Sequence, residues 1–257
     1  MEIGKDINNW ITIKKAIHTE DFICFIHFIY GNNAHAISMI QPINDTVISS
    51  NTCEIIYNLF DKTQTIKERR SEYYIDYYTN KQRSRSNLYQ NNQLMEEKIY
   101  CGREYEHNLT TNTQYNYIYA NNEPIAVYIQ NGSSKLYYLY TNHNGSIEKI
   151  TDIDGGVVDE MTYTPFGQRR MPSDWTRKDT AKHLIDRGFT GQQHLDEFSL
   201  INFNGRMYDP VISHFLSPDP YVQMPDNPLN YNRYAYCLFS PNQYVDPNGE
   251  IVMQILC

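Results

Sequence analysis

Tyrosines recur along the middle of the chain at an almost constant spacing, and this regularity limits the folds that are possible. Successive members lie 19 to 23 residues apart; they are Tyr57, Tyr78, Tyr100, Tyr119, Tyr140 and Tyr163. Tyr119 and Tyr140 each close a Tyr-x-Tyr pair, which places two rings on one face of a β-strand. A constant period of this length predicts a repeat architecture in which each unit packs on its neighbours.

Turn-forming pairs lie between these tyrosines. Asn131-Gly132, Asn144-Gly145 and Asp154-Gly155 favour two-residue turns, which require a positive φ. The segments between them alternate apolar and polar residues or form short apolar runs. Each repeat is therefore predicted to be one β-hairpin. Because a single hairpin is marginal alone, the hairpins are expected to share one curled sheet, with tyrosine rings along its faces.

Composition narrows the functional classes. The chain carries 22 Lys and Arg against 30 Asp and Glu, a net charge of −8, which argues against a nucleic-acid binder. The five cysteines are widely spaced and form no CxxC pair, so neither a zinc site nor a disulfide framework is indicated. The histidines are dispersed, and no nucleotide-binding loop occurs. No cofactor and no metal are predicted.

The N-terminal segment lacks the features of a signal peptide. The most hydrophobic run, residues 22–30, is too short for a transmembrane helix and is predicted to be a buried strand. Residues 1–20 are expected to pack poorly. One short helix is predicted over residues 176–187, between Pro172 and Gly188.

A series of short motifs follows in a fixed order. The Tyr-x-Tyr-Asp/Thr pattern before a glycine resembles the YD repeats of Rhs proteins, and the second half of the chain resembles the Rhs repeat-associated core. The resemblance covers residues 30–249. The matching stretches are YLYTNHNGSI (138–147), YTPFG (163–167), RGFTG (187–191), HLDEF (194–198), NGRMYDP (204–210), FLSPDP (215–220), NRYAY (232–236) and YVDPNG (244–249).

The resemblance implies a β-strand spiral that forms part of a hollow shell, which in this family encloses a C-terminal polypeptide, often a toxin. The core closes one end of the shell. It also implies an aspartyl-protease-like pair, carried here by Asp219 and Asp246, with Arg233 as a supporting charge. Two close carboxyls can share one proton, so that one acts as acid while the other activates water. The alternative is that both aspartates are turn residues of Asp-Pro sequences.

The sequence departs from the family pattern in three places that bear on activity, one of which is Phe239-Ser-Pro241 where Asn-Asn-Pro is usual. The usual Gly-Arg before the phenylalanine of the YDP motif is replaced by Ser213-His214, and Glu250 follows the final glycine where leucine is frequent. The chain is expected to divide into residues 1–29, which are unassigned, hairpin repeats over 30–170, a loop-rich core cap over 171–249 and a tail over 250–257. Such a short tail cannot hold a toxin domain, which suggests a truncated or orphan core.

Three functions therefore compete. The first is a structural shell fragment without cargo, the second a core that cleaves itself once, and the third an adhesion or carbohydrate-binding module with exposed tyrosines. The expected partners are further shell repeats or an enclosed C-terminal polypeptide, with self-association through an exposed edge strand. The resemblance implies a secreted or cell-surface protein, and the chain expressed alone is expected in the cytoplasm.

Overall fold

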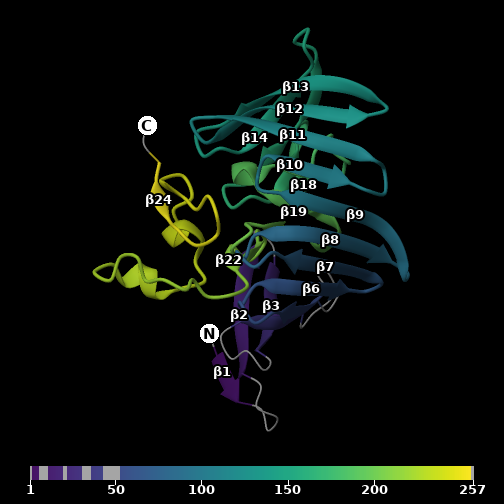
Figure 1. Ribbon diagram of the computed structural model, residues 1–257. Helices are drawn as coiled ribbons and strands as arrows, with labels where there is room; N and C mark the ends of the chain where they lie inside the picture. Colours follow the sequence, from purple (N-terminus) through teal and green to yellow (C-terminus); the bar gives the residue numbers. More distant parts are fainter. Residues whose placement is uncertain (1, 6–10, 20–21, 31–35, 43–52, 256–257) are drawn as a thin grey trace.

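The described part of the chain is dominated by one long antiparallel sheet. The computed structural model describes the backbone of residues 2–5, 11–19, 22–30, 36–42 and 53–255, and the side chains of residues 30, 36–40 and 53–255. Fifteen strands of this part pair in strict chain order, each with the next (Figure 1). They are β1 (Glu2–Lys5), β2 (Ile11–Thr19), β3 (Phe22–Tyr30), β4 (Ile37–Pro42), β5 (Cys53–Tyr57), β6 (Thr63–Glu68), β7 (Ser71–Tyr77), β8 (Arg83–Gln90), β9 (Gln93–Cys101), β10 (Tyr105–Asn108), β11 (Thr113–Ala120), β12 (Glu123–Asn131), β13 (Ser133–Thr141), β14 (Ile147–Thr151) and β15 (Val157–Glu160).

The predicted mainly-β fold is confirmed, and each repeat supplies two antiparallel strands. One repeat forms β11 and β12, for example, and the next forms β13 and β14. The apolar run at residues 22–30 is strand β3. The expected poor packing of residues 1–20 lies outside the described side chains. No helix in the described part is long and apolar enough to cross a membrane.

The turns differ from the predicted two-residue type at all three glycines. At Gly132 the flanking residues Asn131 and Ser133 pair with each other, so a single residue lies between them. Around Gly145 and Gly155 the chain makes longer turns, because Asn142 and Asp152 each accept hydrogen bonds from backbone N–H groups two and four residues later. Gly145 and Gly155 are the fourth residues of these turns, and both have a positive φ, as predicted. Two-residue turns with two positive φ values occur instead at residues 91–92 and 121–122, where both residues are asparagine.

The C-terminal region (residues 161–255) folds into three small sheets and short 3₁₀ turns that lie against the long sheet. A first sheet contains β16, β17 and β18, a second contains β19 to β22, and a third pairs β23 with β24. The bounds are β16 (Thr162–Tyr163), β17 (Arg169–Met171), β18 (Asp174–Lys178), β19 (Gln193–Leu195), β20 (Leu200–Asn202), β21 (Met207–Asp209), β22 (His214–Phe215), β23 (Tyr244–Val245), β24 (Met253–Gln254), η1 (Phe189–Gly191), η2 (Asp196–Phe198), η3 (Pro228–Tyr231) and η4 (Tyr236–Phe239).

The helix predicted over residues 176–187 is wrong. The start of this segment lies in β18, which pairs with β17, and the rest has no regular structure. Two contacts favour the extended path. The Leu184 N–H donates to Asp159 at 2.7 Å, and Ile185 is inserted into the core beside the sheet. A largely polar helix here would have had no apolar stripe with which to bury these residues.

The inner face of the sheet and the C-terminal region share their core. Ile55, Ile66 and Ile75 of the sheet pack with Leu200 and Met207 of the C-terminal region. Full burial of such a side chain stabilises the fold by about 1.5–3 kcal/mol. A second, aromatic cluster fills the C-terminal region itself; its buried members are Phe189, Ile201, Phe203, Tyr208, Phe215, Tyr236 and Cys237.

Buried ion pairs fasten the two parts together. Lys98 of β9 contacts Asp186 at 2.8 Å, and Glu106 of β10 contacts Arg187 at 2.5 Å. The Arg187 guanidinium also lies over the ring of Tyr117, 3.8 Å from its centroid. Separation of either pair would leave a buried charge unpaired, which is strongly destabilising. These contacts therefore hold residues 186–187 at one position on the sheet.

Gly167 provides a test of this packing. Its φ is +91°, and an added Cβ would lie 2.6 Å from the Phe189 ring. Gly132 has a φ of +65° but open space around the same position. Gly132→Ala should cost about 1–2 kcal/mol through backbone strain alone. Gly167→Ala should cost about 1–3 kcal/mol more through overpacking. Equal losses in chemical denaturation would contradict the close approach to Phe189.

Candidate functional site

The two aspartates proposed from sequence lie close together in the C-terminal region. Asp219 follows β22 in the loop that leads to η3, and Asp246 follows β23 directly. Both side chains are buried, with 6% of Asp219 and none of Asp246 exposed. The fold therefore joins two positions that are far apart in the chain, as a shared site requires.

Arg206 lies between the two carboxylates. One of its terminal nitrogens, Nη2, is 3.1 Å from Asp219 Oδ2 and 3.1 Å from Asp246 Oδ2. Its guanidinium also lies over the Phe215 ring, 3.7 Å from the centroid. Sequence reasoning quoted the motif that contains Arg206 but did not assign the residue to the site. Residue type alone could have pointed to Arg206, since a guanidinium is the usual partner for a buried carboxylate.

Each carboxylate also holds the local backbone through its other oxygen. Asp246 Oδ1 accepts hydrogen bonds from the N–H groups of Gly249 at 2.7 Å, Glu250 at 3.1 Å and Ile251 at 3.2 Å. Asp219 Oδ1 accepts from the Tyr221 N–H at 2.8 Å. Both aspartates are thus turn residues as well as partners of Arg206.

Arg233 takes a different place from the one expected of a supporting charge. Its side chain is exposed, and its Nε donates to the backbone oxygen of Asp219 at 2.6 Å. The Arg233 carbonyl accepts from Arg206 Nη1 at 3.0 Å and from the Asp219 N–H at 2.7 Å. Arg233 therefore contacts the Asp219 backbone, while Arg206 contacts its carboxylate.

The chain that follows Asp246 is held by its backbone. Four consecutive carbonyls, from Pro247 to Glu250, each accept a hydrogen bond from a different residue of the C-terminal region. Gln223 makes two such contacts, because its amide donates to one backbone carbonyl and accepts from one backbone N–H. The donors to the four carbonyls are Gln192 Nε2 (2.7 Å), the Gly205 N–H (2.9 Å), Arg206 Nε and Gln223 Nε2 (3.0 Å), and Val252 N–H donates to Gln223 Oε1 (3.0 Å).

Burial governs the protonation of this cluster. Loss of hydration raises the pKa of the Asp219 and Asp246 carboxyls, and the Arg206 charge opposes the rise in both. Loss of hydration also lowers the pKa of Arg206. With every group ionised, the three side chains carry one net negative charge, so retention of one proton by the carboxyls would make the cluster neutral. Among the described residues, no group of three or more His, Cys, Asp or Glu is arranged to hold a metal ion.

Comparison with known proteins identifies the family. Residues 75–241 match the family model described as Teneurin YD-shell. The chain belongs to the teneurin YD-shell family. The match contains Arg206, Asp219 and Arg233 and ends before Asp246. The resemblance to YD-repeat proteins that the sequence motifs carry is confirmed.

Similar YD-shell segments occur within much larger proteins. The chain is 31% identical over 126 residues to salivary gland surface protein 1 of Aedes aegypti, covering 48% of this chain and 3% of that protein. It is 31% identical over 122 residues to the tRNA nuclease WapA of Bacillus subtilis strain 168, covering 48% of this chain and 5% of WapA. The YD-shell chain thus spans a small fraction of the curated relatives it matches.

Solved structures show the same fold. The Photorhabdus luminescens Tc holotoxin pore with the mutation TccC3-D651A superposes with a TM-score of 0.64 at 17% identity, over 98% of this chain and 13% of that one. A TcdB2-TccC3-TEV crystal structure gives a TM-score of 0.63 at 16% identity, over 94% of this chain and 13% of that one. The YD-shell chain therefore has the fold of one section of these longer chains.

Proposed function

We propose that this chain is the closing section of an Rhs-type shell, in which residues 171–249 form the cap and anchor the polypeptide that continues past Gly249. Its partners are further shell repeats and that polypeptide, and the protein acts outside the cell or at its surface. The observation that supports this proposal is the buried Asp219–Arg206–Asp246 cluster, which binds the chain at Gly249 through Asp246 and Arg206.

The anchoring role is favoured over proton sharing by the position of Arg206. In an aspartyl-protease-like pair, the two carboxyls share one proton between them. Here one guanidinium nitrogen bridges them, and the remaining oxygen of each accepts backbone N–H groups. A bridging cation favours the ionised form of both carboxyls, which suits a fixed structural clamp.

A single self-cleavage is the second candidate, and a separate observation favours it. The Gly249 carbonyl, which belongs to the bond joining Gly249 to Glu250, accepts a hydrogen bond from Arg206 Nε. A cation at a carbonyl oxygen would stabilise the negative charge that develops when water attacks its carbon. The raised pKa of each aspartate would let one carboxyl keep the proton that the leaving nitrogen needs.

Intact mass spectrometry of the purified chain and of Asp246→Asn separates the two candidates. We expect the full-length mass for both proteins, because an Asp219–Arg206–Asp246 cluster that only anchors the chain does not cleave it. The introduced asparagine also retains an oxygen that can accept from the backbone N–H groups. Loss of the peptide after Gly249 from the parent alone would overturn this proposal in favour of cleavage. Asp226→Asn, at an exposed aspartate, is the matched control and should behave as the parent does.

A further inference from the structure

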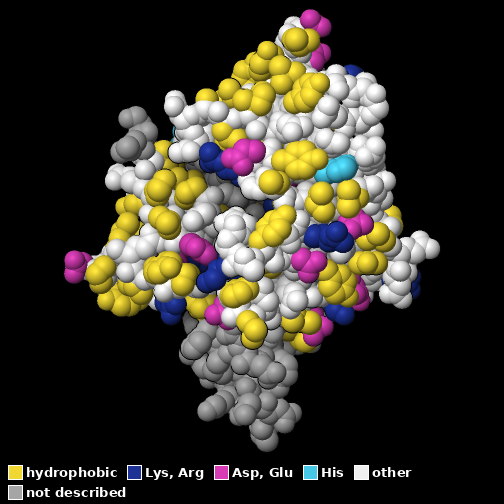
Figure 2. All heavy atoms as spheres, viewed as in Figure 1, with side chains coloured by type: hydrophobic (Ala, Val, Ile, Leu, Met, Phe, Trp, Pro, Cys, Tyr) yellow, Lys and Arg dark blue, Asp and Glu magenta, His cyan; other side chains and the backbone are white. Residues whose placement is uncertain are grey.

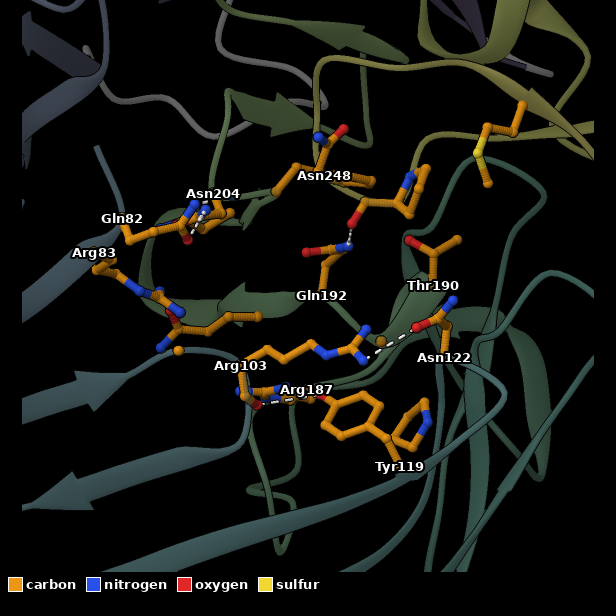
Figure 3. Close-up of a pocket in the computed structure, with 18 residues that line it drawn as sticks. Gln82, Arg83, Arg103, Tyr119, Asn122, Arg187, Thr190, Gln192, Asn204 and Asn248 are labelled. Carbon is orange, nitrogen blue, oxygen red and sulfur yellow. Dashed lines mark hydrogen bonds between the residues drawn. The ribbon is translucent and has the colours of Figure 1, made fainter. Parts of the chain in front are cut away.

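A cavity of about 500 Å³ lies between the long sheet and the C-terminal region (Figure 3). One wall is formed by three turns at the same end of the strands of the long sheet. These turns lie between β7 and β8, between β9 and β10, and between β11 and β12. The opposite wall contains residues 187 and 190–193, residues 202–204 and the backbone-anchored residues 247–248. The surface in Figure 2 is hollowed near its centre, between the two parts. This volume is typical of sites for small organic ligands.

Three arginines line the cavity although the whole chain is acidic. The described residues that line it include Arg83, Arg103 and Arg187 and no Asp or Glu, whereas the chain carries a net charge of −8. Arg187 is neutralised by Glu106, behind the wall. Arg83 lies over the Tyr100 ring at 3.8 Å, and its Nη1 donates to Gln193 Oε1. No carboxylate of the described residues lies within ion-pair distance of it, although Glu106 and Asp186 act on its charge from further away. A guanidinium beside a cavity that has no direct ion-pair partner attracts an anion.

Arg103 is the residue best placed to meet that anion. It reaches across the cavity in Figure 3, where its Nη2 donates to Asn122 at 3.2 Å. Its guanidinium lies over the Tyr119 ring, 4.3 Å from the centroid. Half of the side chain is exposed, and its ion pair with Glu104 is equally open to solvent. An ion pair of this kind contributes little energy and can be exchanged for contact with a ligand.

Amide side chains supply the rest of the polar lining. Gln192 points into the cavity in Figure 3, and its nitrogen is held by the Pro247 carbonyl, which leaves its oxygen toward the open space. Gln82 and Asn204 join through one amide hydrogen bond of 2.9 Å, and each keeps a second polar atom for other contacts. Amides both donate and accept, which matches the hydroxyl groups of a sugar.

We propose that this cavity binds a small sugar that carries one anionic group, a carboxylate or a phosphate. The anionic group lies against Arg103 with the charge of Arg83 behind it, and the sugar hydroxyls meet Gln192 and Asn122. None of Asp219, Arg206 and Asp246 lines the cavity. Because residues 247–248 of the anchored chain form part of its wall, the site rests on the proposed anchoring but not on cleavage.

Isothermal titration of the full chain with glucuronic acid, glucose 6-phosphate, glucose and inorganic phosphate tests the proposal. We expect at least one charged sugar to bind about tenfold more tightly than glucose and than phosphate alone, since a charged hydrogen bond contributes about 1.5–3 kcal/mol. The tighter of the two charged sugars identifies the anionic group. Arg103→Gln should weaken that binding about tenfold, and added salt should weaken it further.

Arg85→Gln is the matched control. Arg85 is half exposed like Arg103 and pairs with Glu97 at 3.1 Å, but it does not line the cavity, so binding should be unchanged. Glucose binding as tightly as the charged sugars would overturn the proposal. So would inorganic phosphate matching glucose 6-phosphate with no binding of glucuronic acid, no binding of any compound at millimolar concentration, or equal losses in the two variants.

Discussion

Replacement of Arg206 by methionine should lower the free energy of unfolding by about 3–5 kcal/mol, because it leaves two buried carboxylates without their cation. Asp246 has no exposed surface and Asp219 has little, so water cannot replace the guanidinium unless the site opens. Methionine retains much of the volume against Phe215, which limits the contribution of lost packing. Urea denaturation at neutral pH measures the loss.

Two controls separate the charge effect from a general loss of structure. Arg233→Gln removes an exposed charge that contacts only backbone of the cluster, and should cost less than about 1 kcal/mol. The deficit of Arg206→Met should also shrink as the pH falls toward 4. Without Arg206 the folded-state pKa of each carboxyl rises further, so the protonated forms support the fold and that support is lost at higher pH. An Arg206→Met protein as stable as the parent at pH 7 would contradict the clamp.

Asp209→Asn should instead stabilise the protein at pH 7, by about 1–3 kcal/mol. Burial raises the pKa of Asp209 from 3.8 to about 6. A folded-state pKa above the unfolded value means that the protonated carboxyl favours folding below pH 3.8, and that this contribution is lost as the pH rises through 6. Asparagine stays neutral and keeps the oxygen that accepts from the Val211 N–H at 2.8 Å.

The pH profile gives the sharper measurement for this variant. The stability difference between Asp209→Asn and the parent should be small near pH 4 and should grow up to pH 7. Asp226→Asn, at an exposed aspartate, is the control and should be as stable as the parent at pH 7. A constant difference across the range would show that Asp209 does not titrate between these values, and a less stable Asp209→Asn at pH 7 would show that the ionised carboxylate supports the fold.

Local patterns allowed the sheet to be predicted, because each hairpin is specified within about twenty residues by alternating side chains and a turn. The exact turn type was not predicted, since at Gly145 and Gly155 it is set by a side chain three residues earlier. The helix over residues 176–187 failed for a non-local reason, the burial of Ile185 beside distant strands.

The sequence predicted the two aspartates of the candidate site but not the arginine between them. Asp219 and Asp246 were found through motifs of a known family, and their proximity follows from the fold. Arg206 changes the chemistry of the pair, yet it lies 13 residues from one partner and 40 from the other. No periodic pattern links such positions. The cavity beside Arg103 is built from six separate stretches of chain, so it had no signal in the linear sequence.

The strict chain order of the long sheet also determines how the molecule can be assembled. Every strand pairs with its immediate neighbour in sequence, so each pairing closes a short loop at small entropic cost. The small sheets of the C-terminal region also pair in chain order, but this region depends in addition on contacts with distant strands. The Tyr57 hydroxyl, for example, donates to the Leu216 carbonyl 159 residues away. The sheet can therefore form hairpin by hairpin during synthesis on the ribosome. The C-terminal region can fold only after the inner face of the sheet has formed, because it packs against that face.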